Sequence, residues 1–196
     1  GVYREQVAVE KSGTKAKPIT IRAEIAGLTE LVGSRRITNW TSVPARKQVF
    51  RAALRKPTHL VFEKDTGIEY REVANLNTLE QTSGTFFHDA DEGAIYAHPS
   101  DNAGMKHHVI DAGVLDYGFV SRTTEPPWAH EPRRVGLRIE GFMIRDFDKG
   151  GIYIHNADYC SIRNCVVHHC RRGIFTANAF RSEITDCEAF NCADRF

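Results

Sequence analysis

The last third of the chain repeats one pattern at a nearly constant spacing, and this repeat restricts the fold more than any other feature. Residues 137–144 align with residues 160–167 after a shift of 23 positions. A second segment, residues 151–154, recurs 22 positions later as residues 173–176. A period of roughly 20 to 50 residues is typical of solenoids, in which each unit buries its apolar side only by stacking on the next.

Each repeat contains short runs in which apolar and polar residues alternate, and this period of two indicates β-strands. A unit near 22 residues with three short strands predicts a right-handed parallel β-helix. The Leu-x-x-Leu-x-Leu pattern of leucine-rich repeats, which have a similar period, is missing. We expect Ile152, Ile154 and Ile162 to point inward. Asn164 should form a sharp corner, because asparagine tolerates the left-handed backbone region, and Gly141 and Asp186 occupy equivalent positions.

All the cysteines lie in the last 37 residues of the chain: Cys160, Cys165, Cys170, Cys187 and Cys192. Their odd number and the absence of CxxC spacing argue against a disulfide scaffold or a zinc site. In the predicted register Cys165 lies below Cys187, and Cys170 below Cys192. We therefore expect stacked thiols that act as small core residues, with a bend of the chain at His168 and His169.

Composition excludes several classes of protein. The chain has 26 Lys and Arg against 25 Asp and Glu, so it lacks the excess positive charge of a nucleic-acid or membrane-surface binder. Apolar residues make up 41% of the chain, which is enough for a packed core, but no apolar stretch has the length of a membrane span. No phosphate-binding glycine loop and no Ser-His-Asp arrangement is evident. We expect no nucleic-acid partner and no membrane insertion.

The first 130 residues do not carry the repeat clearly. We divide the chain into first β-helix coils at 1–42, an irregular β-rich insertion and return at 43–133, and regular coils at 134–196. Two early coils are expected, with strands at residues 7–9 and 19–21. The insertion should contain strands near 48–52, 59–62 and 108–110, a hairpin of residues 85–89 and 93–97 around an Asp-Glu-Gly turn, and a loop at 125–128.

The last residue, Phe196, falls on the inward position of Ile152 and Ile174 when the repeat is continued. The chain as given then ends within a first strand and leaves an uncapped edge, which favours pairing with further strands. We expect the remainder of the same protein, or another chain, to stack on this edge.

Several short motifs in the first hundred residues resemble a large set of secreted bacterial right-handed parallel β-helix repeat proteins. The motifs of the opening are Gly1-Val2-Tyr3-Arg4-Glu5, Ser12-Gly13-Thr14, Pro18-Ile19-Thr20-Ile21, Gly33-Ser34 and Trp40. The segment Gly84-Thr85-Phe86-Phe87-His88-Asp89, followed by Ala94-Ile95-Tyr96, is similar to a later element of the same set. The set includes β-helix glycoside hydrolases, polysaccharide lyases, uronan epimerases and many proteins without a known function. The resemblance implies a secreted protein, extracellular or periplasmic, that acts on carbohydrate.

The candidate site lies on the outer face of the first strand of each coil, where a linear polymer can cross several coils. We expect Tyr153 and Phe175 to face outward, one above the other, and flat aromatic rings suit sugar stacking. The alternative is an aromatic pair that only stabilises the sheet. His155 on the same face is a candidate general acid or base, with Asp158 as its partner. The alternatives are a solvated histidine and an aspartate bonded to its own turn.

Charged residues on the neighbouring turns extend this candidate site. Arg171 and Arg172, with Lys149 one coil earlier, place positive charge beside the groove, and arginine forks suit carboxylates such as uronates. Nearby acidic residues (Asp146, Asp148 and Asp194) make a salt-bridged rim an equal alternative. A separate acidic group of Asp89, Asp91 and Glu92 is a candidate Ca²⁺ site, although it lacks a full calcium loop and a solvated turn explains it as well. We expect no other metal or cofactor.

Two hypotheses of function follow. The first is a secreted carbohydrate-active protein that binds and cleaves a polysaccharide, either as a glycoside hydrolase or as a polysaccharide lyase. A hydrolase needs two carboxylates at a defined separation, and no decisive pair is visible. The second is a non-catalytic structural or adhesion solenoid of a cell-surface or extracellular assembly, in which the stiff β-helix serves as a spacer.

Overall fold

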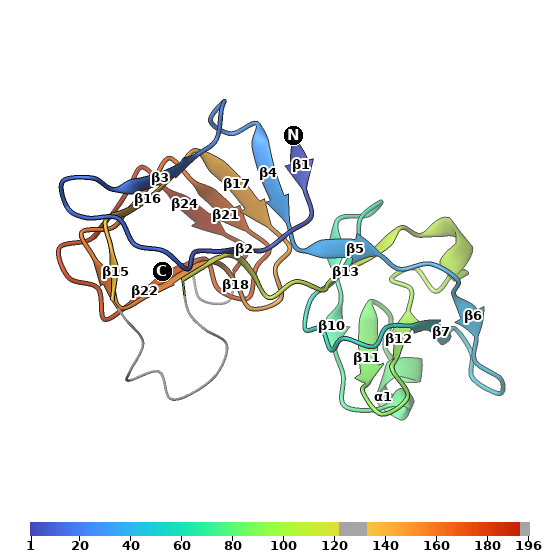
Figure 1. Ribbon diagram of the computed structural model, residues 1–196. Helices are drawn as coiled ribbons and strands as arrows, with labels where there is room; N and C mark the ends of the chain where they lie inside the picture. Colours follow the sequence, from blue (N-terminus) through green and yellow to red (C-terminus); the bar gives the residue numbers. More distant parts are fainter. Residues whose placement is uncertain (122–132, 193–196) are drawn as a thin grey trace. The chain divides into compact units, whose positions relative to one another are not determined.

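The computed structural model describes residues 1–121 and 133–192, and the chain forms two compact units (Figure 1). The first unit combines Gly1–Gly33 with Leu115–Phe196, and the second contains Ser34–Val114. The expectations for the 125–128 loop, for Asp194 and for Phe196 lie outside the described residues. Among the residues that are described, no helix has the length and apolar character needed to cross a membrane.

The first unit consists of parallel sheets that extend through successive coils (Figure 1). One sheet contains β2 (Val7–Ala8), β14 (Tyr117–Val120), β18 (Gly150–His155) and β22 (Ile174–Ala177). A second contains β3 (Ile19–Arg22), β16 (Leu137–Glu140), β20 (Ser161–Arg163) and β23 (Glu183–Thr185). The third contains β1 (Val2–Tyr3), β4 (Thr29–Val32), β17 (Phe142–Arg145), β21 (Val166–His168) and β24 (Glu188–Phe190). The short strands β15 (Arg134–Val135) and β19 (Ala157–Asp158) pair with each other.

The strand register confirms the predicted repeat and with it the right-handed parallel β-helix. Ile139 pairs with Ile162, and Ile162 pairs with Ile184 on the next coil. On the first strand of the coil, Ile152 pairs with Ile174. Each inward side chain therefore lies about 4.8 Å from its equivalent in the neighbouring coil, and the core is built from rows of like residues.

The predicted corner between the second and third strands is also confirmed. Gly141, Asn164 and Asp186 have φ values of 81°, 50° and 54°, in the left-handed region. His169 has a φ of 49°, which gives the bend expected at His168 and His169. Glycine, asparagine and aspartate enter this region at low cost, so the repeat sets the corners as well as the core.

The interior of the β-helix is apolar, and the cysteines belong to it. Ile152, Ile154, Ile162 and Val167 are buried in one cluster with Phe119. All five cysteines are thiols; Cys160, Cys165 and Cys170 are buried, and Cys187 and Cys192 are half-buried against the same cluster. The backbone N–H of Glu188 donates to the carbonyl of Cys165, as expected if Cys187 stacks on Cys165.

The boundaries of the insertion differ from those expected at residues 43 and 133. One coil, β2–β3–β4, precedes the insertion rather than two, and the chain returns to the β-helix at β14 rather than near Arg134. Phe119 of β14 pairs with Ile152, which lies 33 positions later instead of 22. A longer segment between β14 and β15 lengthens this coil, so the regular period does not reveal it.

The second unit is mainly antiparallel. One sheet has the order β10 (Arg71–Glu72), β11 (Thr85–Asp89), β12 (Ala94–His98), β7 (Phe50–Ala53) and β6 (Thr41–Ser42). The other has the order β5 (Ser34–Arg36), β13 (Ile110–Gly113), β8 (Val61–Glu63) and β9 (Ile68–Glu69). The antiparallel pairing of β11 with β12 confirms the predicted hairpin. Phe86, Ile95 and Ile110 belong to a core of this unit that is separate from the core of the β-helix.

Two short helices of the second unit were not predicted. The helix α1 (Leu76–Gln81) begins after Asn75, whose side chain accepts hydrogen bonds from the N–H groups of Asn77 and Thr78. Its six residues are too few to show a helical apolar period, so only the asparagine cap marks it in the sequence. The 3₁₀ turn η1 (Met105–His107) precedes His108.

Candidate functional site

Three successive coils of the β-helix stack aromatic rings along one face. Tyr117 of β14 lies 5.5 Å from Tyr153 of β18, measured between ring centroids, with an interplanar angle of 21°. Tyr153 in turn lies 5.2 Å from Phe175 of β22, with an angle of 23°. The stacking of Phe175 on Tyr153 agrees with the predicted register. Tyr117 was missed because its coil is longer than the regular period.

The exposure of these rings corrects the picture of an open aromatic platform. Tyr153 alternates with the core residues Ile152 and Ile154 and points away from the core, yet it is only 9% exposed. Phe175 is half-buried. The ring faces are engaged with one another, so the stack offers ring edges and the outer parts of Tyr117 and Phe175 to a ligand.

The predicted pairing of His155 with Asp158 is wrong. Asp158 forms an ion pair with Arg133, whose guanidinium also donates to the carbonyl of Asn178 at 3.0 Å. The hydrogen bonds from Arg133 lower the pKa of Asp158, which keeps this carboxylate charged. The ring of His155 lies 6.3 Å from that of Tyr153, and its backbone N–H donates to the hydroxyl of Ser121 at 2.9 Å. His155 thus stays on the candidate face without the acidic partner expected for it.

The positive residues beside the stack have distinct surroundings. Arg171 and Arg172 are exposed on the turn before β22, and the guanidinium carbon of Arg172 lies 5.3 Å from the ring centroid of Phe175. This is a cation–π distance. Lys149 donates to Asp116 at 2.9 Å, and this bond raises the pKa of Lys149. The rim is therefore salt-bridged at Lys149, whereas the Arg172 side chain lies over the end of the aromatic stack.

The acidic group considered for Ca²⁺ forms an ordinary turn between β11 and β12. The carboxylate of Asp89 accepts from the N–H of Glu92 at 3.0 Å. Glu92 in turn accepts from the hydroxyl of Tyr96 at 2.6 Å and lies 3.6 Å from Arg51. Of the described residues, one group of three places metal-binding atoms within 4.8 Å of one another, and this turn does not contribute to it.

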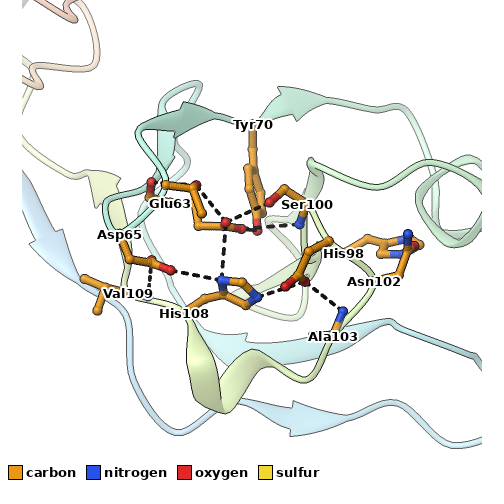
Figure 2. A network of polar contacts seen from close by, with 11 residues as sticks. Glu63, Asp65, Tyr70, His98, Ser100, Asn102, Ala103, His108 and Val109 are labelled. Carbon is orange, nitrogen blue, oxygen red and sulfur yellow. Dashed lines mark hydrogen bonds and ion pairs between the residues drawn. The ribbon is translucent and has the colours of Figure 1, made fainter.

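That group is a polar cluster of Glu63, Asp65 and His108 in the second unit (Figure 2). The side chain of Glu63 is fully buried at the end of β8, and that of His108 is 4% exposed. The Nδ1 atom of His108 lies 3.2 Å from Oε1 of Glu63 and 3.2 Å from Oδ2 of Asp65. Its Nε2 atom lies 3.0 Å from the carboxylate of Asp101. One imidazole therefore faces three carboxylates.

Hydrogen bonds keep Glu63 ionised in spite of its burial. Burial by itself would raise the pKa of Glu63, but donation by Tyr70, Ser100 and Thr66 outweighs it, and the pKa falls below its ordinary value. Thr66 and Ser100 each donate through a hydroxyl at 2.7 Å. Burial and the hydrogen bond to Glu63 raise the pKa of Tyr70, so this phenol remains a donor. The carboxylate is thus fixed in place as a charged group.

The other members of the polar cluster are charged for related reasons. Burial would lower the pKa of His108, but Asp65, Glu63 and Asp101 raise it overall. Burial would raise the pKa of Asp65, but the N–H of Val109 and the ring of His108 lower it overall. Sequence reasoning missed this cluster because Glu63 and His108 are far apart in a region without a repeat. The only local signal is the pair Glu63 and Asp65 two positions apart at the end of a strand.

Comparisons with known proteins agree with the fold. Residues 133–195 match a family model described as a right-handed β-helix region. A solved structure entitled "The complex structure of XylC with xylose" aligns with 98% of this chain at a TM-score of 0.64 and 16% identity. The chain spans about half of that structure, which is covered over 48% of its length. No curated protein matches the sequence. The fold is thus that of a right-handed parallel β-helix, and the comparisons support the predicted β-helix family.

Proposed function

We propose that this protein binds a carbohydrate chain along the face formed by β14, β18 and β22. The observation that carries the proposal is the aromatic stack of Tyr117, Tyr153 and Phe175 next to the exposed Arg171 and Arg172. The stack crosses three coils in the direction in which a linear polymer would run. Aromatic edges and an arginine fork together suit a sugar ring that carries a carboxylate. The structure of similar fold whose title names xylose supports carbohydrate as the class of ligand.

The test of binding uses the intact chain and a panel of neutral and acidic polysaccharides. The variant F175A/R172A removes a ring edge and a charge from the candidate face. The matched control F180A/R181A removes another phenylalanine–arginine pair, with a ring-to-guanidinium distance of 4.9 Å and a phenylalanine that is 54% exposed. We expect at least about a tenfold loss of affinity for the first variant only, since contacts of this kind contribute about 1 to 2 kcal/mol. Equal binding by both variants and the unchanged protein would refute the proposal.

Cleavage of the bound polymer, as a glycoside hydrolase or a polysaccharide lyase, is the finer form of this proposal. The two reactions are separated by following reducing ends together with the absorbance of unsaturated uronides. Reducing ends without unsaturation indicate hydrolysis, and both signals together indicate a lyase in which Arg171 and Arg172 hold a uronate. Binding without either signal leaves a carbohydrate-binding solenoid. Secretion to the cell exterior or periplasm belongs to the same proposal and is tested by fractionation of the native cells.

A non-catalytic structural or adhesion solenoid is the second candidate. The observation in its favour is that the aromatic faces stack on one another and Tyr153 is nearly buried, as expected for a stack that stabilises the sheet. In this case F175A/R172A lowers stability but the intact chain binds no polysaccharide of the panel.

A further inference from the structure

Three side chains of the polar cluster direct ligand atoms at a common point in the second unit (Figure 2). Glu63 is the last residue of β8, Asp65 lies in the turn that follows it, and His108 follows η1. The fold therefore brings together two carboxylates and one imidazole from segments that are 43 to 45 positions apart in the chain. Imidazole nitrogen and carboxylate oxygen are common zinc ligands in proteins.

The separations between these atoms are longer than direct pairing would give. A charge-assisted hydrogen bond between nitrogen and a carboxylate oxygen is usually about 2.7 to 2.9 Å long. The Nδ1 atom of His108 instead lies at the same 3.2 Å from one oxygen of Glu63 and one of Asp65. A single N–H has one direction and cannot align well with both oxygens. Bonds of 2.0 to 2.1 Å in a tetrahedron place neighbouring ligand atoms about 3.3 Å apart, which is close to both separations.

The residues around the cluster fix the orientation of each ligand. The Nε2 atom of His108 lies 3.0 Å from Asp101, so a proton on Nε2 leaves Nδ1 with its lone pair toward Glu63 and Asp65. The other oxygen of Asp65 accepts from the N–H of Val109 at 2.8 Å. A carboxylate behind a ligating histidine is the usual outer-shell partner of a metal site.

From this geometry we propose that Glu63, Asp65 and His108 bind one divalent transition-metal ion, for which Zn²⁺ is the best match. The nitrogen ligand disfavours Ca²⁺ and Mg²⁺, which prefer oxygen. Exposure differs between the ligands: the side chains of Glu63 and His108 are 0% and 4% exposed, whereas that of Asp65 is 32% exposed. An ion can therefore enter beside Asp65, and water completes its coordination. The ion joins β8 to the segment before β13 and stabilises the second unit by mass action.

The experiment titrates the chelator-treated full chain with Zn²⁺ by calorimetry and records the melting temperature with and without the ion. We expect one ion per chain and a higher melting temperature when it is bound. Asp65→Asn keeps an oxygen for the N–H of Val109 but removes the charged ligand, and H108Q removes the imidazole. Each should weaken binding more than D101A, for which the loss of an outer-shell partner predicts about 10- to 100-fold.

The matched control is H59Q, which removes another histidine of the same unit that contacts a glutamate, Glu72, at 2.9 Å. It should leave the affinity and the stoichiometry unchanged. Cobalt gives a second readout, because Co²⁺ in a tetrahedral site develops strong visible absorption bands that a purely structural role of the cluster would not produce. The proposal is overturned if the unchanged chain binds no ion at one-to-one stoichiometry. It is equally overturned if folded Asp65→Asn, checked by circular dichroism, binds Zn²⁺ as tightly as the unchanged chain.

Discussion

The two units of this protein encode their structures in different ways. In the β-helix unit each inward residue packs against its own equivalent in the next coil, as Ile152 does with Ile174. In the second unit the partners are unlike one another, and the buried carboxylate of Glu63 is held by Tyr70, Ser100 and Thr66 from different segments. The first kind of packing leaves a period in the sequence, and the second leaves almost none.

This difference has an energetic side. The rows of the β-helix are apolar and nearly interchangeable, so their contribution is spread over many similar contacts. The polar cluster of the second unit concentrates charge in a buried place, where each partner that is lost leaves another group unsatisfied. Substitutions can therefore separate the two units experimentally.

The largest expected effect comes from deleting one phenylalanine in each core. Phe86 and Phe119 are both fully buried, in the core of the second unit and of the β-helix respectively. Each change to alanine should cost about 3 to 5 kcal/mol of unfolding free energy through lost burial and a cavity. By hydrogen exchange, F86A should expose the amides of β11 and β12 and leave those of β17 and β21 protected. Loss of protection in both units at once would show that they unfold together.

A smaller effect is expected for Glu63→Gln, measured in chelator so that no metal contributes. The amide keeps the shape of the side chain but weakens hydrogen bonds to a buried charged group, which are worth about 1.5 to 3 kcal/mol. The control Glu72→Gln changes an exposed glutamate in the same unit and should alter stability by less than about 0.5 kcal/mol. Denaturant unfolding gives both values. Equal effects would remove the contrast between buried and exposed carboxylates.

The corners of the β-helix should show an effect of about 1 kcal/mol. Asn164 has a φ of 50°, and an ordinary side chain pays about 1 to 2 kcal/mol for the left-handed region. Asn164→Ala should therefore destabilise the β-helix unit, whereas Asn164→Gly should leave its unfolding free energy nearly unchanged. If glycine destabilises as much as alanine, the side chain of Asn164 matters for a contact and not for the backbone.

The smallest effect on the fold is expected from native thiol labelling, which tests the order of burial along the cysteine rows. Cys165 and Cys170 are at most 1% exposed, and burial raises the pKa of Cys165 to about 11. Cys187 and Cys192 are half-buried. A thiol reagent, followed by peptide mass spectrometry, should label Cys187 and Cys192 well before Cys165 and Cys170. Equal labelling would mean that the coils open readily.

Much of the β-helix could be predicted because its determinants are local or periodic. The inward isoleucines, the corner at Asn164 and the thiol rows follow from one repeat, and the hairpin of β11 and β12 follows from its turn residues. The pairing of His155 with Asp158 failed because Arg133, from a different coil, competes for the carboxylate. No spacing within the repeat contains that information.

By itself the sequence determined the class of fold, because a period of 22 to 23 residues with alternating strands has only one economical way to bury its apolar rows. Tertiary structure decided where the insertion leaves and rejoins the β-helix, that Tyr117 extends the aromatic stack, and that Glu63, Asp65 and His108 meet. The physical reason is the same in each case. Contacts between residues far apart in the chain depend on how the intervening segments fold, and a single sequence carries no local sign of the distance they close.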